Sequence, residues 1–575
     1  MFKDLNSRSQ AKNSLAHTHA QQESQYRLQD HDKVLILGGG PAGCSAAMYL
    51  KKMKPTLQVI VLDNRNEKAM STGGPGSCKG CVGGISGFLL DQLKTDFNII
   101  LPKHLINNQV SSVRFINLLD RHRETCFEID IAKDLRGIWD PPNMDSVLVS
   151  VGNGKGKYNH PEGKNISFDF FLRSKASEMG VEFINGYVNA IQVPEDPADE
   201  VKVNFTRKRL KSTLIWYKKY QHGKISVDPN KQSKNHKEID NAALVVNATG
   251  LNSRNRIELS HYNTKDDTLR PAPAKRATGK IMGIFDIDIE QEYLQKKFGN
   301  TICVYGGIKG TNAIVAAPKY LQKGGSWLTI AILLDRDIEP EYDNTCADEH
   351  CTKSIPHSFR NEMKSIRDNF LHKSGLGKHL NLQNIKKSTC RCAPIIPHNV
   401  SEKPYGNRYI EVGDSSGAMK YGRNGIPYAF NSAKRAMEAA VSIGVSEKDF
   451  KTHYDKTFIA PIRRDNQLGK YIMKWNGFIN RHAALTSTYY EIASESPLLK
   501  RYAIQILFGI RGSDTYTQST LRLLKDSYGG LSLLFGLFKW YTRNGFGKFL
   551  EERSEKVQKT DAQKLDRHQT RRQET

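Results

Sequence analysis

A glycine-rich turn near the N-terminus has the spacing of a phosphate-binding loop. Gly38, Gly40 and Gly43 form the pattern G-x-G-x-x-G, directly after the apolar residues 34–37 and before a stretch of helix-forming residues. In such a turn the first glycine permits the bend, the second lets the backbone approach a pyrophosphate, and the third lets the helix pack on the strand. The phosphates would lie at the helix N-terminus, where amide groups and the helix dipole favour an anion. The pattern predicts a dinucleotide cradle.

An acidic residue follows at the distance that a dinucleotide site requires. A second apolar run, residues 59–62, ends in Asp63, twenty residues after Gly43. A carboxylate at this position accepts hydrogen bonds from ribose hydroxyls, and its charge disfavours a phosphate on that ribose. The alternative is an ordinary glycine-rich turn followed by a surface aspartate. Turn and acid together favour the nucleotide site.

Two cysteines have a spacing that could support redox chemistry. Cys78 and Cys81 form C-x-x-C, and Lys79 between them favours a thiolate. The pair could cycle as a disulfide beside a cofactor, contact the substrate, supply half of a metal site, or be structural. No second C-x-x-C is present, and the spacing of Cys390 and Cys392 does not match a zinc ribbon, so we expect no metal site.

Composition limits what surrounds these residues. The chain has 575 residues, 38% of them hydrophobic, which is enough for two or more domains with large cores. Its nine cysteines follow no secretory signal, and no apolar run reaches the length of a bilayer span, so we expect a reduced, cytoplasmic protein.

The charge is strongly positive and partly concentrated in one stretch. The formal net charge is +25, and residues 206–237 contain ten Lys or Arg but one acid, Asp228. A basic surface can attract anionic lipid, nucleic acid or a phosphorylated substrate. Because no nucleic-acid motif accompanies it, we expect a solvated basic hairpin and no specific nucleic-acid site.

Two later segments resemble further parts of a nucleotide domain. Residues 244–250, LVVNATG, form an apolar strand that ends in A-T-G, and residues 409–417, YIEVGDSSG, form a strand that ends in Gly-Asp. Residues 425–427, Gly-Ile-Pro, then precede a run of helix formers. Proline in a first helical turn loses no hydrogen bond, and the helix N-terminus favours an anion. An ordinary capped surface helix is the alternative.

In combination, these motifs resemble FAD-dependent oxidoreductases of the glutathione-reductase-like superfamily, in the branch with aromatic hydroxylases, halogenases and geranylgeranyl reductases. The resemblance is greatest to geranylgeranyl-reductase-type flavoproteins. It depends on the order of the motifs, on residues 167–169 before a helix, on residues 317–319 before a strand, and on the segment GDSSGAMKYGRNGIPYAFNSAKRAMEAA. It covers residues 33–441 and implies FAD as the cofactor.

The resemblance also implies which positions contact FAD. The glycine turn would hold the pyrophosphate, Asp63 would bind the adenosine ribose, and Val188 would lie near the adenine. The A-T-G strand would pass beneath the cofactor, the aspartate of the Gly-Asp pair would bind the ribityl chain, and the following helix would point at the flavin. In chain order these residues are Gly38, Gly40, Ala42, Gly43, Asp63, Val188, Thr249, Gly250, Gly413, Asp414, Gly425 and Ile426.

The predicted fold class is α/β, with a discontinuous Rossmann-like FAD-binding domain, a β-sheet-based substrate domain and a C-terminal helical region. Hydrophobic spacing predicts a helix over residues 168–180 and a strand over residues 181–193. We expect a disordered polar tail, 1–29, and a charged tail, 551–575. The expected FAD-binding domain consists of 30–110, 165–260 and 403–445, with the basic insertion 206–237. The expected substrate domain consists of 111–164 and 271–402, with strands at 280–287, 301–305, 312–317 and 326–334, and the expected helical region is 446–550.

The expected function is a FAD-dependent oxidoreductase that reduces an apolar, prenyl or lipid-like substrate by hydride transfer from reduced flavin, with NADPH or NADH as electron donor. A flavin-dependent monooxygenase or halogenase is the enzymatic alternative. The chain lacks the W-x-W-x-I-P pattern of tryptophan halogenases and the Asp-Gly motif of aromatic hydroxylases, and it lacks the second glycine-rich cradle of disulfide reductases. Cys78 and Cys81 are the candidate catalytic residues.

A third hypothesis is a non-catalytic, membrane-associated protein with a relic nucleotide fold. It is suggested by the basic charge and by the long terminal extensions. Membrane contact itself is suggested by two C-terminal segments, residues 496–511 with one apolar helical face and the apolar run 531–541. Such segments fit interfacial helices on an anionic membrane, and they fit helices that cover a cleft equally well. The expected partner is an apolar small molecule or lipid, with peripheral membrane contact left open; the sequence does not indicate the oligomeric state.

Overall fold

The computed structural model describes most of the chain between residues 26 and 503. The described residues are 26–64, 83–117, 126–134, 146–149, 167–206, 236–251, 257–263, 268–271, 279–306, 311–320, 326–338, 365, 386–392, 395–397, 400–419, 425–479, 483–497, 499–500 and 503. Cys78, Cys81, the basic residues 207–235 and the apolar run 531–541 lie outside them.

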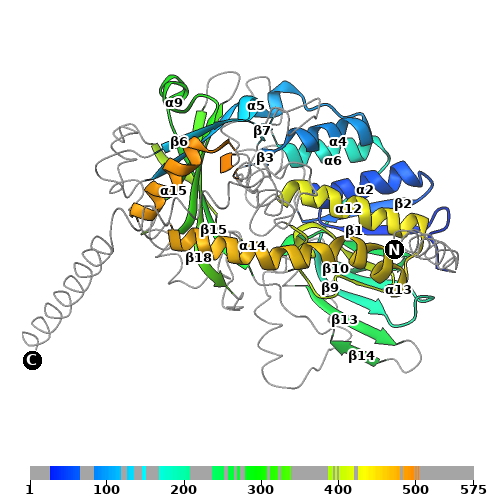
Figure 1. Ribbon diagram of the computed structural model, residues 1–575. Coiled ribbons are helices and arrows are strands. Elements are labelled where there is room, and N and C mark those ends of the chain that lie inside the picture. The colour runs from blue at the N-terminus through cyan, green and yellow to red at the C-terminus, as the bar shows by residue number, and fades with distance from the viewer. Residues whose placement is uncertain are drawn as a thin grey trace, which may run out of the picture.

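A six-stranded, mostly parallel sheet contains the strand that precedes the glycine turn (Figure 1). Five of its strands are parallel and lie in the spatial order β22, β12, β1, β2, β8. Read from β8 to β22 and numbered by their order along the chain, these strands follow the 3-2-1-4-5 order of Rossmann-like folds. The strands are β1 (Lys33–Leu37), β2 (Gln58–Asp63), β8 (Glu182–Asn185), β12 (Leu244–Asn247) and β22 (Tyr409–Glu411), with antiparallel β21 (Tyr405–Gly406) at the edge.

Both faces of this sheet are buried, which explains why its strands are apolar without alternation. Val34 and Ile36 of β1 pack into a core shared with helices, whereas Leu35 and Leu37 pack into a core shared with a second sheet. In Figure 1 the helices lie on one side of β1 and β2, and the second sheet lies on the other. The covering helices are α2 (Pro41–Met53), α4 (Gly87–Phe97), α6 (Phe168–Glu178) and α12 (Gly425–Ser442). The predicted helix over 168–180 is confirmed as α6.

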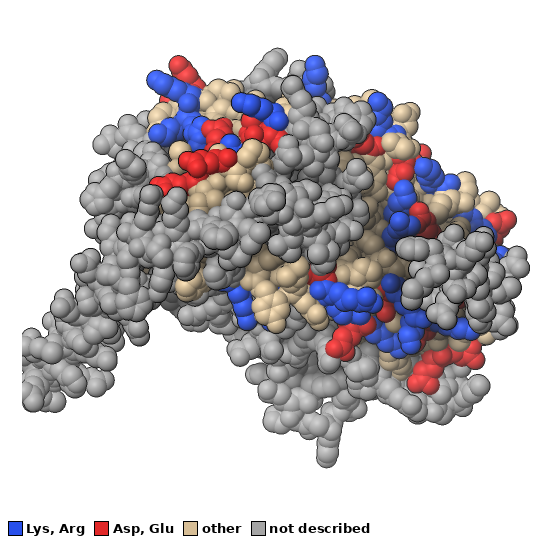
Figure 2. Space-filling view, viewed as in Figure 1, with Lys and Arg blue, Asp and Glu red and all other residues tan. Residues whose placement is uncertain are grey.

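The second sheet has five strands, in the order β11, β10, β9, β13, β14. They are β9 (Tyr187–Pro194), β10 (Val201–Thr206), β11 (His236–Ala242), β13 (Glu258–Asn263) and β14 (Thr268–Pro271). β10 and β11, which flank the basic residues 207–235, form an antiparallel pair. On the face shown in Figure 2, the basic and acidic side chains of the described residues are interspersed.

The single strand predicted over residues 181–193 is wrong, because the chain changes sheets at Gly186. β8 ends at Asn185 in the six-stranded sheet, and β9 begins at Tyr187 in the second sheet. Gly186 N donates to the carbonyl oxygen of Asp63 at 3.0 Å, which ties this corner to the end of β2. A period-two pattern continues through such a corner, because both strands are half-buried.

An eight-stranded sheet forms the other large layer, with β19, β15, β18, β17, β16, β5 and β6 in spatial order and β20 paired to β15. Its strands are β5 (Ser112–Asn117), β6 (Cys126–Asp130), β15 (Gly279–Asp288), β16 (Thr301–Gly306), β17 (Thr311–Tyr320), β18 (Ser326–Ile338), β19 (Lys386–Cys392) and β20 (Ile395–Pro397). The four strands predicted between residues 280 and 334 are confirmed as β15 to β18. Parallel pairing of β5 with β16 brings in a segment nearly 200 residues earlier in the chain.

Smaller elements connect these layers. A three-stranded sheet contains β3 (Gly84–Ile85), β7 (Ser146–Val149) and β4 (Ile106–Val110), in that order. Buried Lys319 of β17 joins it to the eight-stranded sheet, because its Nζ donates to the carbonyl oxygen of Val149 at 2.9 Å. The remaining short helices are η2 (Lys103–Leu105), α5 (Ile131–Asp134), α9 (Gln291–Phe298) and η7 (Gly413–Ser415).

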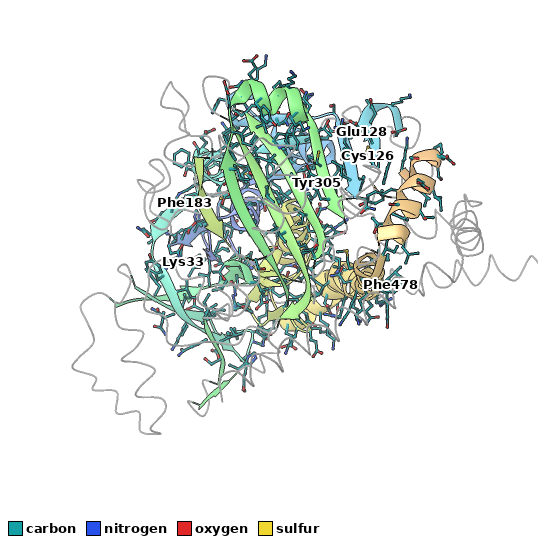
Figure 3. All side chains as sticks on the ribbon, turned by 90° about the vertical axis from the view of Figure 1, so that its left-hand side faces the viewer. Lys33, Cys126, Glu128, Phe183, Tyr305 and Phe478 are labelled. Carbon is teal, nitrogen blue, oxygen red and sulfur yellow. The ribbon has the colours of Figure 1, made fainter. Side chains whose placement is uncertain are left out.

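The C-terminal helices run from α12, beside the six-stranded sheet, to the eight-stranded sheet. α13 (Glu447–Phe450), the π-helical η8 (Lys451–Ile459) and α14 (Ala460–Ile479) follow one another directly, and α15 (Ala483–Glu495) comes next. Figure 3 shows α15 beside β6, which carries the labelled Cys126 and Glu128. None of the helices among the described residues has the length and hydrophobicity needed to cross a membrane.

The N-terminal boundary differs from the expected one. Residues 26–29, expected within a disordered tail, are ordered: Leu28 is buried in the helix-side core, and Val445 N donates to the carbonyl oxygen of Tyr26 at 2.9 Å. A single apolar side chain and one backbone bond are too weak a pattern to stand out in a polar sequence.

Candidate nucleotide-binding site

The glycine turn between β1 and α2 has no space for side chains. Gly38 has a φ of 96°, a left-handed conformation that favours glycine, and its N–H donates to the carbonyl oxygen of Leu62 at 2.7 Å. A Cβ on Gly43 would lie 1.8 Å from the carbonyl oxygen of Gly38. Gly40 is the N-cap of α2 and Pro41 opens the helix, so no side chain caps the N-terminus. The turn and the first helical turn therefore present bare backbone.

Asp63 holds the middle of this turn. Its side chain is buried, and its Oδ2 accepts a hydrogen bond from Gly39 N at 2.9 Å. A Cβ on Gly39 would lie 2.5 Å from that oxygen, so this position also requires glycine. The sequence analysis missed Gly39, although the three consecutive glycines at 38–40 were a visible signal. The acid at the end of β2 therefore contacts the turn directly.

The A-T-G segment lies against the glycine turn. Ala248 N donates to the carbonyl oxygen of Leu37 at 2.8 Å, and a Cβ on Gly38 would lie 2.6 Å from the carbonyl oxygen of Ala248. These contacts occur at the carboxyl ends of β1 and β12, the neighbouring strands between which the order along the chain reverses. Ligands of open parallel sheets bind in the crevice at such a switch point.

The Gly-Asp segment contacts both of the others. Gly413 begins η7 with a φ of 61°, and a Cβ on it would lie 2.7 Å from Cβ of Ala42 in the first turn of α2. Two residues on, Ser415 Oγ accepts a hydrogen bond from Gly250 N at 2.8 Å. Three segments that are far apart in sequence thus meet at one edge of the sheet.

Asp414 lies beside the start of α12. Burial raises the pKa of its carboxyl group from an ordinary value of 3.8 to about 6, although part of the side chain reaches the surface. A Cβ on Gly425, the first residue of α12, would lie 3.5 Å from Asp414 Oδ1. The first turn of α12 contains no acidic residue of its own, and the Asp414 carboxyl lies beside it. Ile426 is partly buried against the helix-side core.

The helices that begin at the site are fixed to each other at a distance from it. Tyr49 of α2 donates its hydroxyl hydrogen to Asp96 Oδ2 of α4 at 2.5 Å, and Lys434 Nζ of α12 lies 2.9 Å from the same oxygen. Burial raises the pKa of Asp96, but the hydrogen bonds from Tyr49 and Lys434 outweigh it and lower that pKa below its ordinary value. An ionised carboxylate therefore fixes α2 and α12 in one relative position.

Val188, an expected cofactor-binding position, lies apart from this cluster. Val188 lies on β9 opposite Phe205, and its side chain packs against the core between the two sheets. Its expected place near an adenine stays a prediction. Cys78 and Cys81, the candidate catalytic pair, lie outside the described residues.

Comparisons with known proteins give structural neighbours but no relative by sequence. No family model matches the chain, and no curated protein matches it significantly. Similar solved structures include p-nitrophenol 4-monooxygenase PnpA from Pseudomonas putida DLL-E4, at 11% identity and a TM-score of 0.49 over 85% of this chain and 100% of that chain.

Two further neighbours have comparable values. The flavin-dependent brominase Bmp2 is 13% identical, with a TM-score of 0.48 over 86% of this chain and 98% of its own. A flavoprotein/dehydrogenase from Cytophaga hutchinsonii is 12% identical, with a TM-score of 0.48 over 86% of this chain and 100% of its own. The strand order of this chain, with helices on one face of the parallel sheet and a second sheet on the other, defines a Rossmann-like α/β fold.

Proposed function

We propose that this protein is a FAD-dependent oxidoreductase. The observation that carries the proposal is the meeting of three distant segments at the switch point of the parallel sheet. Gly38 touches the A-T-G turn, Gly250 bonds to Ser415, and Gly413 packs on Ala42. A mononucleotide needs only the first of these segments, whereas an extended dinucleotide can use all three. The arrangement therefore favours a ligand that spans from β2 to α12.

The residues present fit the parts of FAD. The backbone N–H groups of Ala42 and Gly43 lie in the first turn of α2, where amides have no acceptor within the helix, so they can donate to a pyrophosphate. The first turn of α2 has no acidic residue to repel it. The Asp63 carboxylate fits a ribose that carries two hydroxyls and no phosphate.

Asp414 and α12 fit the flavin half. With a pKa of about 6, the Asp414 carboxyl is ionised at neutral pH and can accept hydrogen bonds from ribityl hydroxyls. The N-terminus of α12 would stabilise negative charge on the flavin ring. When bound, FAD would supply hydride and electron transfer, and the chain would supply orientation and electrostatic support.

For the reaction, we propose hydride transfer to an apolar, prenyl or lipid-like acceptor, with NADPH or NADH as the donor. The eight-stranded sheet, whose strands pack apolar side chains such as Ile302, Ala316 and Ile330 into a core, is the layer that would shield the reaction from water in this proposal. The sequence also lacks the halogenase and hydroxylase patterns described above. The candidate role of Cys78 and Cys81 in this reaction is part of the same proposal.

The proposal is tested by spectroscopy and oxygen consumption. We expect the flavin-free protein to bind FAD and to lose the oxidised flavin absorbance on anaerobic addition of NADPH or NADH. An apolar prenyl acceptor should then restore that absorbance without oxygen. Oxygen consumption that depends on the organic substrate would overturn the reductase proposal and favour a monooxygenase or halogenase. Absence of FAD binding would overturn the oxidoreductase proposal itself and favour the non-catalytic alternative.

We also propose peripheral contact with anionic membrane through α14. Tyr471 and Phe478 are 70% and 40% exposed, and their spacing of seven residues places them on one face of the helix. Exposed Lys474 lies between them. Aromatic side chains flanked by basic ones are typical of helices that lie in the interface of an anionic bilayer.

A further inference from the structure

A carboxylate is buried inside the six-stranded sheet, behind the candidate site. Glu411, the last residue of β22, is fully buried, and its Oε1 accepts a hydrogen bond from the hydroxyl of Tyr409 at 2.8 Å. The same hydroxyl accepts a hydrogen bond from Nδ2 of Asn247 at 3.0 Å, on the neighbouring strand β12. Tyr409 and Asn247 are each at most 3% exposed. The three side chains form a hydrogen-bonded chain that is shielded from water.

The chain of hydrogen bonds continues from Asn247 to the A-T-G turn. Asn247 Oδ1 accepts two hydrogen bonds from Thr249, one from its backbone N–H at 3.2 Å and one from its Oγ1 at 2.8 Å. The first of these bonds is an Asx turn, in which an Asn side chain determines the backbone two residues later. Gly250 follows with a φ of 77° and donates its N–H to Ser415 Oγ, next to Asp414. The buried chain therefore ends at the contact between two of the three site segments.

The groups at the two ends of this hydrogen-bonded chain determine which atom donates and which accepts in each hydrogen bond. The backbone N–H of Thr249 can only donate, so the amide oxygen of Asn247 must face it and the amide nitrogen must face Tyr409. The Tyr409 hydroxyl then accepts from Asn247 and must give its own hydrogen to Glu411. The Glu411 Oε1 atom accepts this hydrogen, so the carboxyl group fits this end of the hydrogen-bonded chain.

We propose that Glu411 is a positioning residue for the FAD site, which acts through Tyr409 and Asn247 to hold the turn at Thr249 and Gly250 in the shape that receives the cofactor. This inference rests on the proposed FAD site. A purely structural purpose would be served as well by an apolar side chain, since a buried carboxylate carries a desolvation penalty that packed apolar residues avoid. A directional hydrogen bond to the A-T-G turn is what the carboxylate adds.

The test removes one hydroxyl from the chain and, as a matched control, another that lies beside it. Tyr409→Phe breaks the chain and keeps the ring. Tyr454→Phe removes an equally buried hydroxyl that donates at 3.0 Å to the backbone carbonyl of the same Glu411 and lies near Ser416 and Ser432, but leaves the hydrogen-bonded chain to Thr249 intact. Both variants should lower the stability of the flavin-free protein in urea. We expect Tyr409→Phe to weaken FAD binding roughly tenfold, the effect of about 1.4 kcal/mol, and Tyr454→Phe to weaken it clearly less.

Amide hydrogen exchange gives a second readout that needs no cofactor. In the flavin-free protein, the amides of Thr249 and Gly250 should exchange faster in Tyr409→Phe than in Tyr454→Phe, because only the first variant releases the Asn247 amide. If Tyr409→Phe does not fold, Glu411→Gln serves instead. Its side chain has the same size, and its amide oxygen is a weaker acceptor than a carboxylate oxygen, so we expect roughly threefold weaker FAD binding.

The outcomes separate this inference from the proposed function. Wild-type protein that binds FAD, with Tyr409→Phe and Tyr454→Phe equal in FAD affinity and in exchange at Thr249 and Gly250, would overturn the positioning role and leave the FAD site standing. Wild-type protein that does not bind FAD would overturn both.

Discussion

Replacement of Asp414 by Asn should stabilise the flavin-free protein and weaken its binding of FAD. Asp414 lies at the convergence of the Gly-Asp segment with α12, and burial raises the pKa of its carboxyl group to about 6. An ionised carboxylate is disfavoured there until a ligand supplies hydrogen-bond donors. The amide of Asn removes that charge at almost the same volume. Stability and cofactor affinity should therefore change in opposite directions.

The sign and size of the stability effect follow from the two pKa values. Between pH 3.8 and about 6 the folded protein holds a proton on Asp414 that the unfolded chain has lost, so the free energy of unfolding falls as pH rises through this window. The two values correspond to about 3 kcal/mol at most, at 1.36 kcal/mol per pH unit. Because part of the side chain reaches solvent, we expect about 1 to 2 kcal/mol. In Asp414→Asn the side chain carries no charge, so the free energy of unfolding does not fall for this reason as pH rises.

The assay is urea unfolding of the flavin-free protein at pH 4, 5, 6 and 8, followed by circular dichroism. The Asn variant should exceed the wild type in unfolding free energy at pH 8, and the advantage should vanish near pH 4. Glu182→Gln, which removes a carboxylate from an exposed position on β8, is the control and should show no such trend. A difference between Asp414→Asn and wild type that stays constant with pH, or a less stable variant at pH 8, would refute the reasoning. At pH 8 the variant should bind FAD roughly tenfold more weakly, because a neutral amide is a weaker acceptor than a carboxylate.

Three other perturbations test separate parts of the account. Gly43→Ala should abolish FAD binding measured by fluorescence titration, because its Cβ would lie 1.8 Å from a carbonyl oxygen of the turn. The control Gly84→Ala should bind FAD as the wild type does, because its Cβ would have no neighbour within 4 Å. Asp63→Asn should weaken FAD binding roughly tenfold and reduce the difference in affinity between a ribose and a 2′-phosphorylated ribose, because the repelling charge is gone; an unchanged affinity would argue against a ribose at this position. Tyr471→Ser combined with Phe478→Ser should reduce co-sedimentation with phosphatidylglycerol vesicles at least roughly threefold, and equal sedimentation of the two proteins would exclude α14 as the contact.

The parts of the fold that could be predicted from the sequence are those encoded locally. The glycine turn follows one strand and is separated from Asp63 by one helix and a second strand, and each of these elements has its own hydrophobic pattern. The strands β15 to β18 are long, apolar and bounded by polar residues, so their positions were also predictable. The A-T-G and Gly-Asp segments were found as strand ends, although their mutual contact required the fold.

The remaining features depend on contacts that no local pattern encodes. Gly186 divides one apparent strand between two sheets because its N–H bonds to the end of β2, which is more than a hundred residues away. Gly39 must be glycine because of the Asp63 carboxylate, a contact that depends on how the turn folds back on β2. Glu411 looked like a polar residue at the end of a strand, and only its pairing with Asn247 reveals the buried chain. Long-range register, rather than propensity, determines all three.

The central claim is that the glycine turn, the A-T-G turn and the Gly-Asp segment together bind one molecule of FAD. A crystal structure of the protein with FAD tests it most directly. The account predicts the pyrophosphate at the N-terminus of α2, the adenosine ribose on Asp63 and the ribityl chain on Asp414 of the same molecule. FAD that contacts Asp63 without reaching Asp414, or that binds at another edge of the sheet, would contradict it.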